Sequence, residues 1–247
     1  MTTAGSGNRG SKAEWEVVNE LIDSNSGEML FFTNHEWEAV EAAASRIIPT
    51  DRDPGAREAR VIVFIDRYLS GIDYHYASAD GRGFLRMAGK DARSARERVV
   101  DLQQLYRAGV SQLDSVAHEL GGCDFTQASE ELQDGVLAHL SGQPKPTTVS
   151  LSAKEVFYSR LQGNTDEGKT FFETLCLHVR QGFYADPVYG GNRGRVGWSV
   201  IGFPGPETLE DTMNGRYSTA SYFMDEYSWE DLLGHYERSG PAADAPN

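Results

Sequence analysis

The chain has 247 residues, of which 39% are hydrophobic and 11% are aromatic, so it can bury one sizeable core. Its formal net charge of -14 argues against a nucleic-acid-binding surface and against electrostatic docking on an anionic membrane. No apolar run approaches the ~20 residues that span a bilayer, and residues 1–10 are small and polar, unlike an export signal. We therefore expect a cytoplasmic protein that is exported only if a partner carries a signal.

Helical signals come first along the chain. Thr33 and Glu36 predict a capping box, in which each side chain accepts the backbone N–H of the other residue. Apolar residues then recur at spacings of three and four until Pro49, which cannot continue a helix. Asp53-Pro54 predicts the start of a second helix, with Asp as cap and Pro in the first turn, and Gly71 predicts its end. We expect these two helices to form a hairpin.

Residues 81–107 are the basic stretch of the chain, with seven Lys or Arg. The apolar residues Val99, Leu102 and Tyr106 keep helical spacing, so these charges are predicted to form a solvated helix face. Docking of an acidic partner surface is the alternative.

The remaining patterns are also mostly helical. Helices are predicted over 113–120, 129–140, 153–161 and 168–182, with a linker around Pro144 and Pro146 and a strand signal only around 196–201. We therefore predict a mainly α fold, an irregular helical bundle with a long, loop-rich aromatic C-terminal arm. Its expected parts are an N-terminal extension (1–29), a helical domain (30–206) and an acidic aromatic arm (207–247).

Common catalytic and cofactor-binding motifs are absent from the sequence. The sequence lacks a Gly-x-Gly-x-x-Gly after a strand, a Gly-x-Ser-x-Gly elbow and a His-x-x-x-His pair. Cys123 and Cys176 are too few for a metal knuckle; Cys176 is expected in the core, and a disulfide between them or to a partner stays open. No catalytic, cofactor-binding or metal-binding residue is therefore assigned to this chain. His75, between two tyrosines, is the histidine that an alternative enzymatic site would use.

A turn-rich segment near residue 190 predicts a shaped contact loop, because it places Pro, Gly and Asn among aromatics. Asp186 and Asn192 are expected to cap backbone donors, while Gly190 and Gly191 allow close backbone approach. Tyr189 and Trp198 are then the expected anchors in a partner's pockets. The alternative is an internal turn that holds the last helices together.

The segment 207–247 differs from the rest of the chain, because it holds nine acids, two bases and many aromatics. We interpret it as an arm laid across a partner. Its expected contact residues are Tyr222, Phe223, Tyr227 and Trp229. The alternative is that these aromatics cover the chain's own core.

Two groups of residues resemble the gluconate 2-dehydrogenase subunit 3 family. The first runs from Phe32-Thr33 to Ile47–Asp51, followed by Pro54–Ala59 and Phe64–Asp66; the second comprises Phe171-Phe172, Gly182, Ala185–Pro187, Tyr189–Asn192, Gly197-Trp198 and Ile201–Gly205. The resemblance covers roughly residues 30–206. It implies a small, mainly helical, non-catalytic subunit of a dehydrogenase.

The same resemblance implies the partner. It is a large FAD-dependent flavoprotein of the glucose-methanol-choline (GMC) type that oxidises a sugar, sugar acid or glycoside, in some complexes together with a cytochrome c subunit. FAD is thus expected in the partner and no cofactor in this chain. Many members carry a twin-arginine signal that this chain lacks, which favours an intracellular complex. The alternatives are a stand-alone enzyme with a pocket among the helices and a transient folding or export chaperone.

Overall fold

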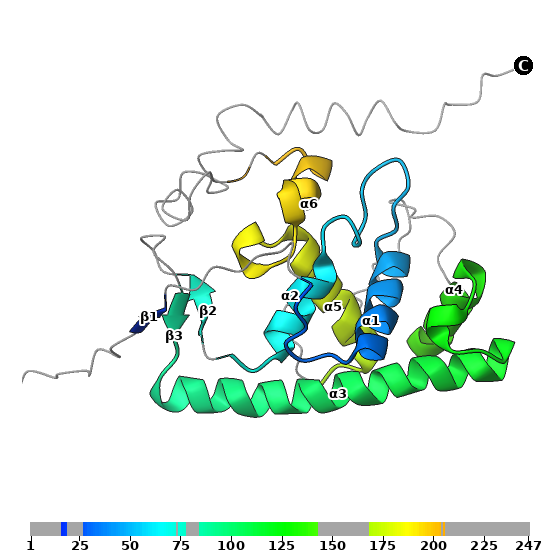
Figure 1. The fold of residues 1–247 in the computed structure, drawn as a ribbon, viewed down its shortest axis with the longest axis horizontal. Coiled ribbons are helices and arrows are strands. Elements are labelled where there is room, and N and C mark those ends of the chain that lie inside the picture. Colours follow the sequence, from blue (N-terminus) through cyan, green and yellow to red (C-terminus); the bar gives the residue numbers. More distant parts are fainter. Residues whose placement is uncertain are drawn as a thin grey trace, which may run out of the picture.

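The computed structural model describes residues 16–18, 27–72, 74–77, 84–142, 168–203 and 205 (Figure 1). Its helices are α1 (Asn34–Ile47), α2 (Val61–Leu69), α3 (Gly89–Gly121), α4 (Glu130–Ser141), α5 (Phe171–Tyr184) and α6 (Val196–Val200). Its strands are β1 (Glu16–Val18), β2 (Tyr74–Ala77) and β3 (Phe84–Arg86). The predicted mainly α fold is confirmed. The expected linker near 144–146, the helix 153–161 and the arm 207–247 lie outside the described residues.

Helix α3 forms the base on which the other helices pack (Figure 1). Helices α1, α2 and α5 lie across it, α4 folds back beside its C-terminal end, and α6 lies at the end of α5 that is farther from α3. One continuous apolar core joins these helices, with fully buried residues such as Val40, Ile65, Tyr106, Leu113 and Leu175. The core therefore lies where α1, α2, α3 and α5 meet.

Helix α1 begins as its sequence predicts. The Glu36 N–H donates to Thr33 Oγ1 at 3.3 Å, and the Thr33 N–H donates to Glu36 Oε2 at 2.9 Å, which confirms the capping box. Val40 and Ala44 are buried on the inner face of the helix. A cap of this kind contributes about 1 kcal/mol, because it satisfies N–H groups that have no partner within the helix.

Helix α2 begins at Val61, so the predicted start at Asp53-Pro54 is wrong. A tight turn occupies the interval, in which the Glu58 carboxylate accepts the Gly55 N–H at 2.8 Å and the Thr50 hydroxyl at 2.6 Å. Arg60 then takes a left-handed conformation with φ 54°, which separates this turn from the helix. The predicted end is confirmed, since α2 stops at Leu69 and Gly71 has φ 77°.

The two helices predicted within 81–107 and over 113–120 are one helix of 33 residues, α3. Its buried side includes Val99, Leu102 and Tyr106, as expected from their spacing, and it ends at Gly122 in the left-handed conformation. Arg93 and Arg96 are exposed, which confirms a solvated charged face. Within the described ranges no helix combines the length and apolarity needed to cross a membrane, and α3 has the length but carries charges throughout.

A small antiparallel sheet with the order β1-β3-β2 lies near the N-terminal end of α3 (Figure 1). Its strands have three or four residues, too few for an alternating pattern to be visible in the sequence. The strand expected around 196–201 is wrong, because Val196–Val200 is the short helix α6. Burial of its Gly197-Trp198 pair against α5 decides this local structure.

Candidate partner-binding site

Helix α5 is the scaffold of the predicted contact loop. Thr170 and Glu173 form a capping box at its start, and Leu175, Val179 and Phe183 are buried along it. Near its C-terminal end, Gly182 lies against α2, where an added Cβ would come within 3.0 Å of Val61. The end of α5 is therefore held rigidly against the core.

The turn after α5 is held by side chains that bond to backbone. Asp186 Oδ1 accepts the Val188 N–H at 3.0 Å. Asn192 is completely buried; its Nδ2 donates to the Ala185 carbonyl at 2.9 Å and its Oδ1 accepts the Gly197 N–H at 2.8 Å. The predicted capping of backbone donors by Asp186 and Asn192 is thus confirmed.

Glycines allow this segment to pack against the end of α5. A Cβ on Gly191 would lie 2.1 Å from the Gly182 carbonyl oxygen, and a Cβ on Gly197 would lie 1.9 Å from the Phe183 carbonyl oxygen. Gly190 has φ 99°, a conformation that L side chains rarely adopt. The close approach predicted for Gly191 therefore occurs within the chain itself, whereas Gly190 supplies the left-handed turn.

Trp198 points inward. It is 6% exposed, and its Nε1 donates to the Tyr184 carbonyl at 2.8 Å. The expectation that its indole projects into a partner's pocket is therefore wrong. Trp198 instead packs α6 against α5, which agrees with the alternative of an internal turn. Tyr189 is half-buried with its ring edge against Phe84, the centroids 6.2 Å apart. Contact of this loop with a partner stays a prediction.

Several residues at this site face outward that were not predicted from the sequence as contact residues. Tyr184, Val200 and Ile201 are 42%, 40% and 57% exposed, and Arg193 and Arg195 are exposed beside them in sequence. We call these five residues the α6 patch. The sequence feature that could have predicted this exposure is the position of Val200 and Ile201 just after the Gly197-Trp198 pair. When one face of a short surface helix is buried, the residues on its other face remain exposed to solvent.

The predicted contacts of the arm, Tyr222, Phe223, Tyr227 and Trp229, lie outside the described residues and stay predictions. His75 lies in β2. Among the described residues, no three His, Cys, Asp or Glu side chains gather as metal ligands.

Tyr106, His178 and Cys176 are buried nucleophilic or titratable side chains of the core. Tyr106 and His178 are buried, share a hydrogen bond of 2.9 Å between the Tyr hydroxyl and Nδ1, and stack with nearly parallel rings. Cys176 is buried as expected, and burial raises the pKa of its thiol to about 12, so it stays protonated at neutral pH. Cys123 and Cys176 are both free thiols, so no disulfide joins them.

A polar cleft of about 620 Å³ lies between α1, the turn before α2 and α4. Some of its charged side chains bond to protein groups around it: Arg46 makes two 2.9 Å bonds to Asp134 and one to Glu130. These carboxylates raise the pKa of Arg46, first through the hydrogen bond to Asp134. The Thr50 hydroxyl, the largest cause, lowers the pKa of Glu58. The cleft is thus lined by groups that cross-link its walls.

Comparison with known proteins gives one match. The sequence model described as Gluconate 2-dehydrogenase subunit 3 matches residues 34–205, from the first residue of α1 to the glycine packed on Trp198. No curated protein and no solved structure matches significantly. Because the match covers well over half of the chain, including the whole site described above, the chain belongs to the gluconate 2-dehydrogenase subunit 3 family.

Proposed function

We propose that this chain is a non-catalytic small subunit that binds and stabilises a larger FAD-dependent oxidoreductase of the GMC type and helps it mature. The observation that carries the proposal is the family match over residues 34–205, because the family is described as a subunit of a dehydrogenase. In this proposal the partner holds FAD and the substrate, a sugar, sugar acid or glycoside.

The chemistry of the described side chains supports a binding role. Tyr106 and His178 bond to each other in the core, and the Cys176 thiol is protonated at neutral pH. The Gly- and Asn-rich segment, which is the most distinctive part of the sequence, bonds to the end of α5. These buried groups hold the helices in a rigid arrangement, which allows the surface of the chain to bind a partner with little loss of entropy.

The experiment is co-expression of the full chain, carrying an affinity tag, with a candidate FAD-dependent dehydrogenase of the GMC type from the same genome. We expect a stoichiometric complex whose flavin absorbance and dye-linked sugar oxidation exceed those of the flavoprotein expressed alone. The tagged chain purified by itself should be colourless and inactive. Sugar oxidation by the chain alone would support the stand-alone enzyme and contradict the proposal, as would a flavoprotein that is fully loaded and active without it.

Gel filtration of the diluted complex separates a permanent subunit from a transient chaperone. A permanent subunit co-elutes with the flavoprotein after dilution, whereas a chaperone is lost. A cytochrome c subunit, the further partner that the family resemblance implies, would be detected in the same fractions by haem absorbance.

Deletion of 207–247 tests the arm: we expect the helical domain to remain folded and co-purification to fail.

A further inference from the structure

The α6 patch gathers exposed apolar surface at one place. Seven large hydrophobic residues are exposed in the described part of the chain, and three of them, Tyr184, Val200 and Ile201, belong to this patch. The hydrogen bond from Trp198 Nε1 to the Tyr184 carbonyl holds the end of α5 beside α6, so Tyr184, Val200 and Ile201 lie on neighbouring elements at the same end of the molecule. Val100 and Leu120, by contrast, lie far apart on α3. Apolar residues that cluster at a surface indicate an interaction site, whereas scattered ones do not.

Two arginines flank this apolar area. Arg193 and Arg195 are exposed, and neither guanidinium pairs with a carboxylate within the described residues. The single carboxylate of residues 184–203 is Asp186, and its side chain bonds to the Val188 N–H. The segment 184–203 therefore presents positive charge in a chain whose net charge is -14.

The backbone that carries these arginines follows an uncommon path, and Arg195 itself lies in the left-handed region. Gly190, Asn192, Gly194 and Arg195 all have positive φ, of 99°, 48°, 61° and 62°. The buried Asn192 side chain and the bond from the Arg193 N–H to the Ala59 carbonyl, 3.0 Å long, maintain this path. A non-glycine residue such as Arg195 in the left-handed region costs free energy, and surroundings that enforce such strain are common at functional surfaces.

We propose that the α6 patch is the surface on which the large flavoprotein subunit docks, through an apolar area flanked by carboxylates on that subunit. This inference rests on the proposed function. Burial of Tyr184, Val200 and Ile201 supplies the apolar centre of the interface, and Arg193 and Arg195 pair with the partner's carboxylates at its edge. Arginine suits this position because its planar group bonds a carboxylate with two parallel hydrogen bonds.

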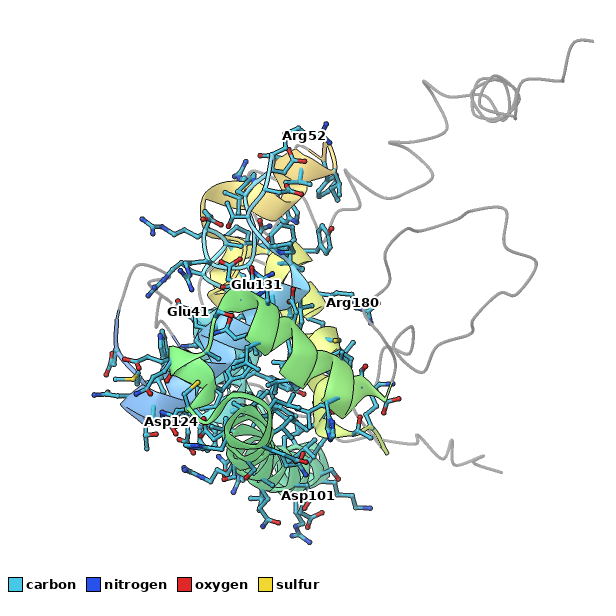
Figure 2. The ribbon with its side chains drawn as sticks, turned by 90° about the vertical axis from the view of Figure 1, so that its right-hand side faces the viewer. Glu41, Arg52, Asp101, Asp124, Glu131 and Arg180 are labelled. Carbon is cyan, nitrogen blue, oxygen red and sulfur yellow. The ribbon has the colours of Figure 1, made fainter. Side chains whose placement is uncertain are left out.

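Figure 2 shows where this surface lies: Arg52, in the turn before α2, is at the end of the molecule that carries α6, and Asp101 on α3 is at the opposite end. Side chains on the outer face of α3 are therefore suitable controls. They provide matched pairs, since Arg93 and Arg96 are exposed arginines, and Val100 and Leu120 are 48% and 50% exposed.

The test measures the affinity of the full-length, co-purified flavoprotein for four variants of the full chain. Two alter the patch, Arg193→Glu with Arg195→Glu and Val200→Ser with Ile201→Ser. Two are controls on α3, Arg93→Glu with Arg96→Glu and Val100→Ser with Leu120→Ser. We expect each patch variant to weaken binding by roughly 10- to 100-fold and each control by less than about twofold. Added salt should weaken the wild-type complex and affect the Arg193→Glu, Arg195→Glu variant less.

The outcomes separate the docking surface from the proposed function. Wild-type binding that the patch variants retain would overturn the docking surface and leave the proposed function standing. Failure of the wild type to bind the flavoprotein would overturn both. Loss of thermal stability in the isolated Val200→Ser, Ile201→Ser variant would show that the chain's own residues cover the patch. Conversion of a dimer to a monomer by that variant would show that a second copy of the chain covers the patch. Either the loss of stability or the change of oligomeric state would overturn the proposal.

Discussion

Two regions of the molecule are held together by different kinds of interaction. At the junction of α5 and α6, the buried amide of Asn192 bonds two backbone groups, and Gly197 contacts the carbonyl of Phe183 directly. Between α1 and α4, ion pairs near the surface add to the contacts of the apolar core, from Arg46 on α1 to Asp134 and to the more exposed Glu130.

The comparison shows which region tolerates change. A buried donor or acceptor that loses its partner costs about 1–3 kcal/mol, because water cannot replace the lost bond. An ion pair near the surface contributes about 0–1 kcal/mol, because water and salt screen it, and Arg46–Asp134, with side chains 14% and 20% exposed, lies at the upper end of this range. The α5–α6 junction should therefore be sensitive to single substitutions, and the ion pairs of α1 should not be. The following predictions test this difference, beginning with the largest effect.

Gly197→Ala is expected to lower the free energy of unfolding by about 3 kcal/mol or more, because the new Cβ would lie 1.9 Å from a backbone oxygen that cannot rotate away. Gly135→Ala is the control, since its Cβ meets nothing within 4 Å in the middle of α4. That change should stabilise the protein by about 0.5–1 kcal/mol. Urea unfolding of both variants measures the difference. Equal stability of the two would show that α6 does not pack on α5 in this way.

Asn192→Ala is expected to destabilise the chain by about 2–4 kcal/mol, because the Gly197 N–H and the Ala185 carbonyl both lose a buried partner. Its effect on structure should be local. The fluorescence of Trp198, which the Asn192 amide holds in place through Gly197, should shift towards that of a solvated indole before global unfolding. Unchanged fluorescence together with unchanged stability would show that the Asn192 side chain does not hold the turn through these two hydrogen bonds.

Arg46→Met is expected to cost only about 1 kcal/mol, because Met keeps the packing of the aliphatic part of the side chain and loses the two bonds to Asp134. The loss should shrink in high salt. Glu130→Gln, at a side chain that is 76% exposed, should change stability by less than about 0.5 kcal/mol. Thermal unfolding at two salt concentrations checks both values, and a salt-independent loss would place Arg46 in a drier environment than the one described.

The smallest effect concerns pH. The hydrogen bond to Asp114 raises the pKa of His35 above its ordinary value of 6.5. Since the folded pKa is the higher one, the stabilisation is complete below the unfolded pKa and disappears as pH rises through the folded pKa. The difference in melting temperature between about pH 5.5 and about pH 8.5 should therefore decrease in His35→Gln, which can still donate to Asp114 but cannot titrate there. An unaltered difference would assign the pH dependence to other groups.

Much of the fold could be predicted from local patterns. The capping box of Thr33 and Glu36, the helix end at Gly71 and the apolar spacing of Val99, Leu102 and Tyr106 all correspond to the structure. Each depends on residues within a turn or two of one another, so the chain encodes them without reference to its other parts. The strands escaped prediction because three residues do not establish an alternation.

The candidate site shows the limit of such reasoning. That Asp186 and Asn192 cap a turn was predictable, because Asp and Asn side chains reach nearby backbone groups wherever the chain bends. The direction in which Trp198 points was not, because a buried anchor within the chain and an exposed anchor for a partner require the same residue type.

The sequence by itself determined the helical class of this protein, the capping box of α1 and the membership of residues 34–205 in the gluconate 2-dehydrogenase subunit 3 family. The tertiary structure decided that α2 begins after a turn held by Glu58, that α3 is continuous, and that α6 is a helix whose Trp198 faces inward. The physical reason is clearest for α6, because Trp198 bonds to the end of α5 and the free energy of burying it there outweighs the small local preferences that a sequence pattern reports. The turn before α2 is closed by bonds from Glu58 to Gly55 and Thr50, a combination that the cap pattern of Asp53-Pro54 does not report.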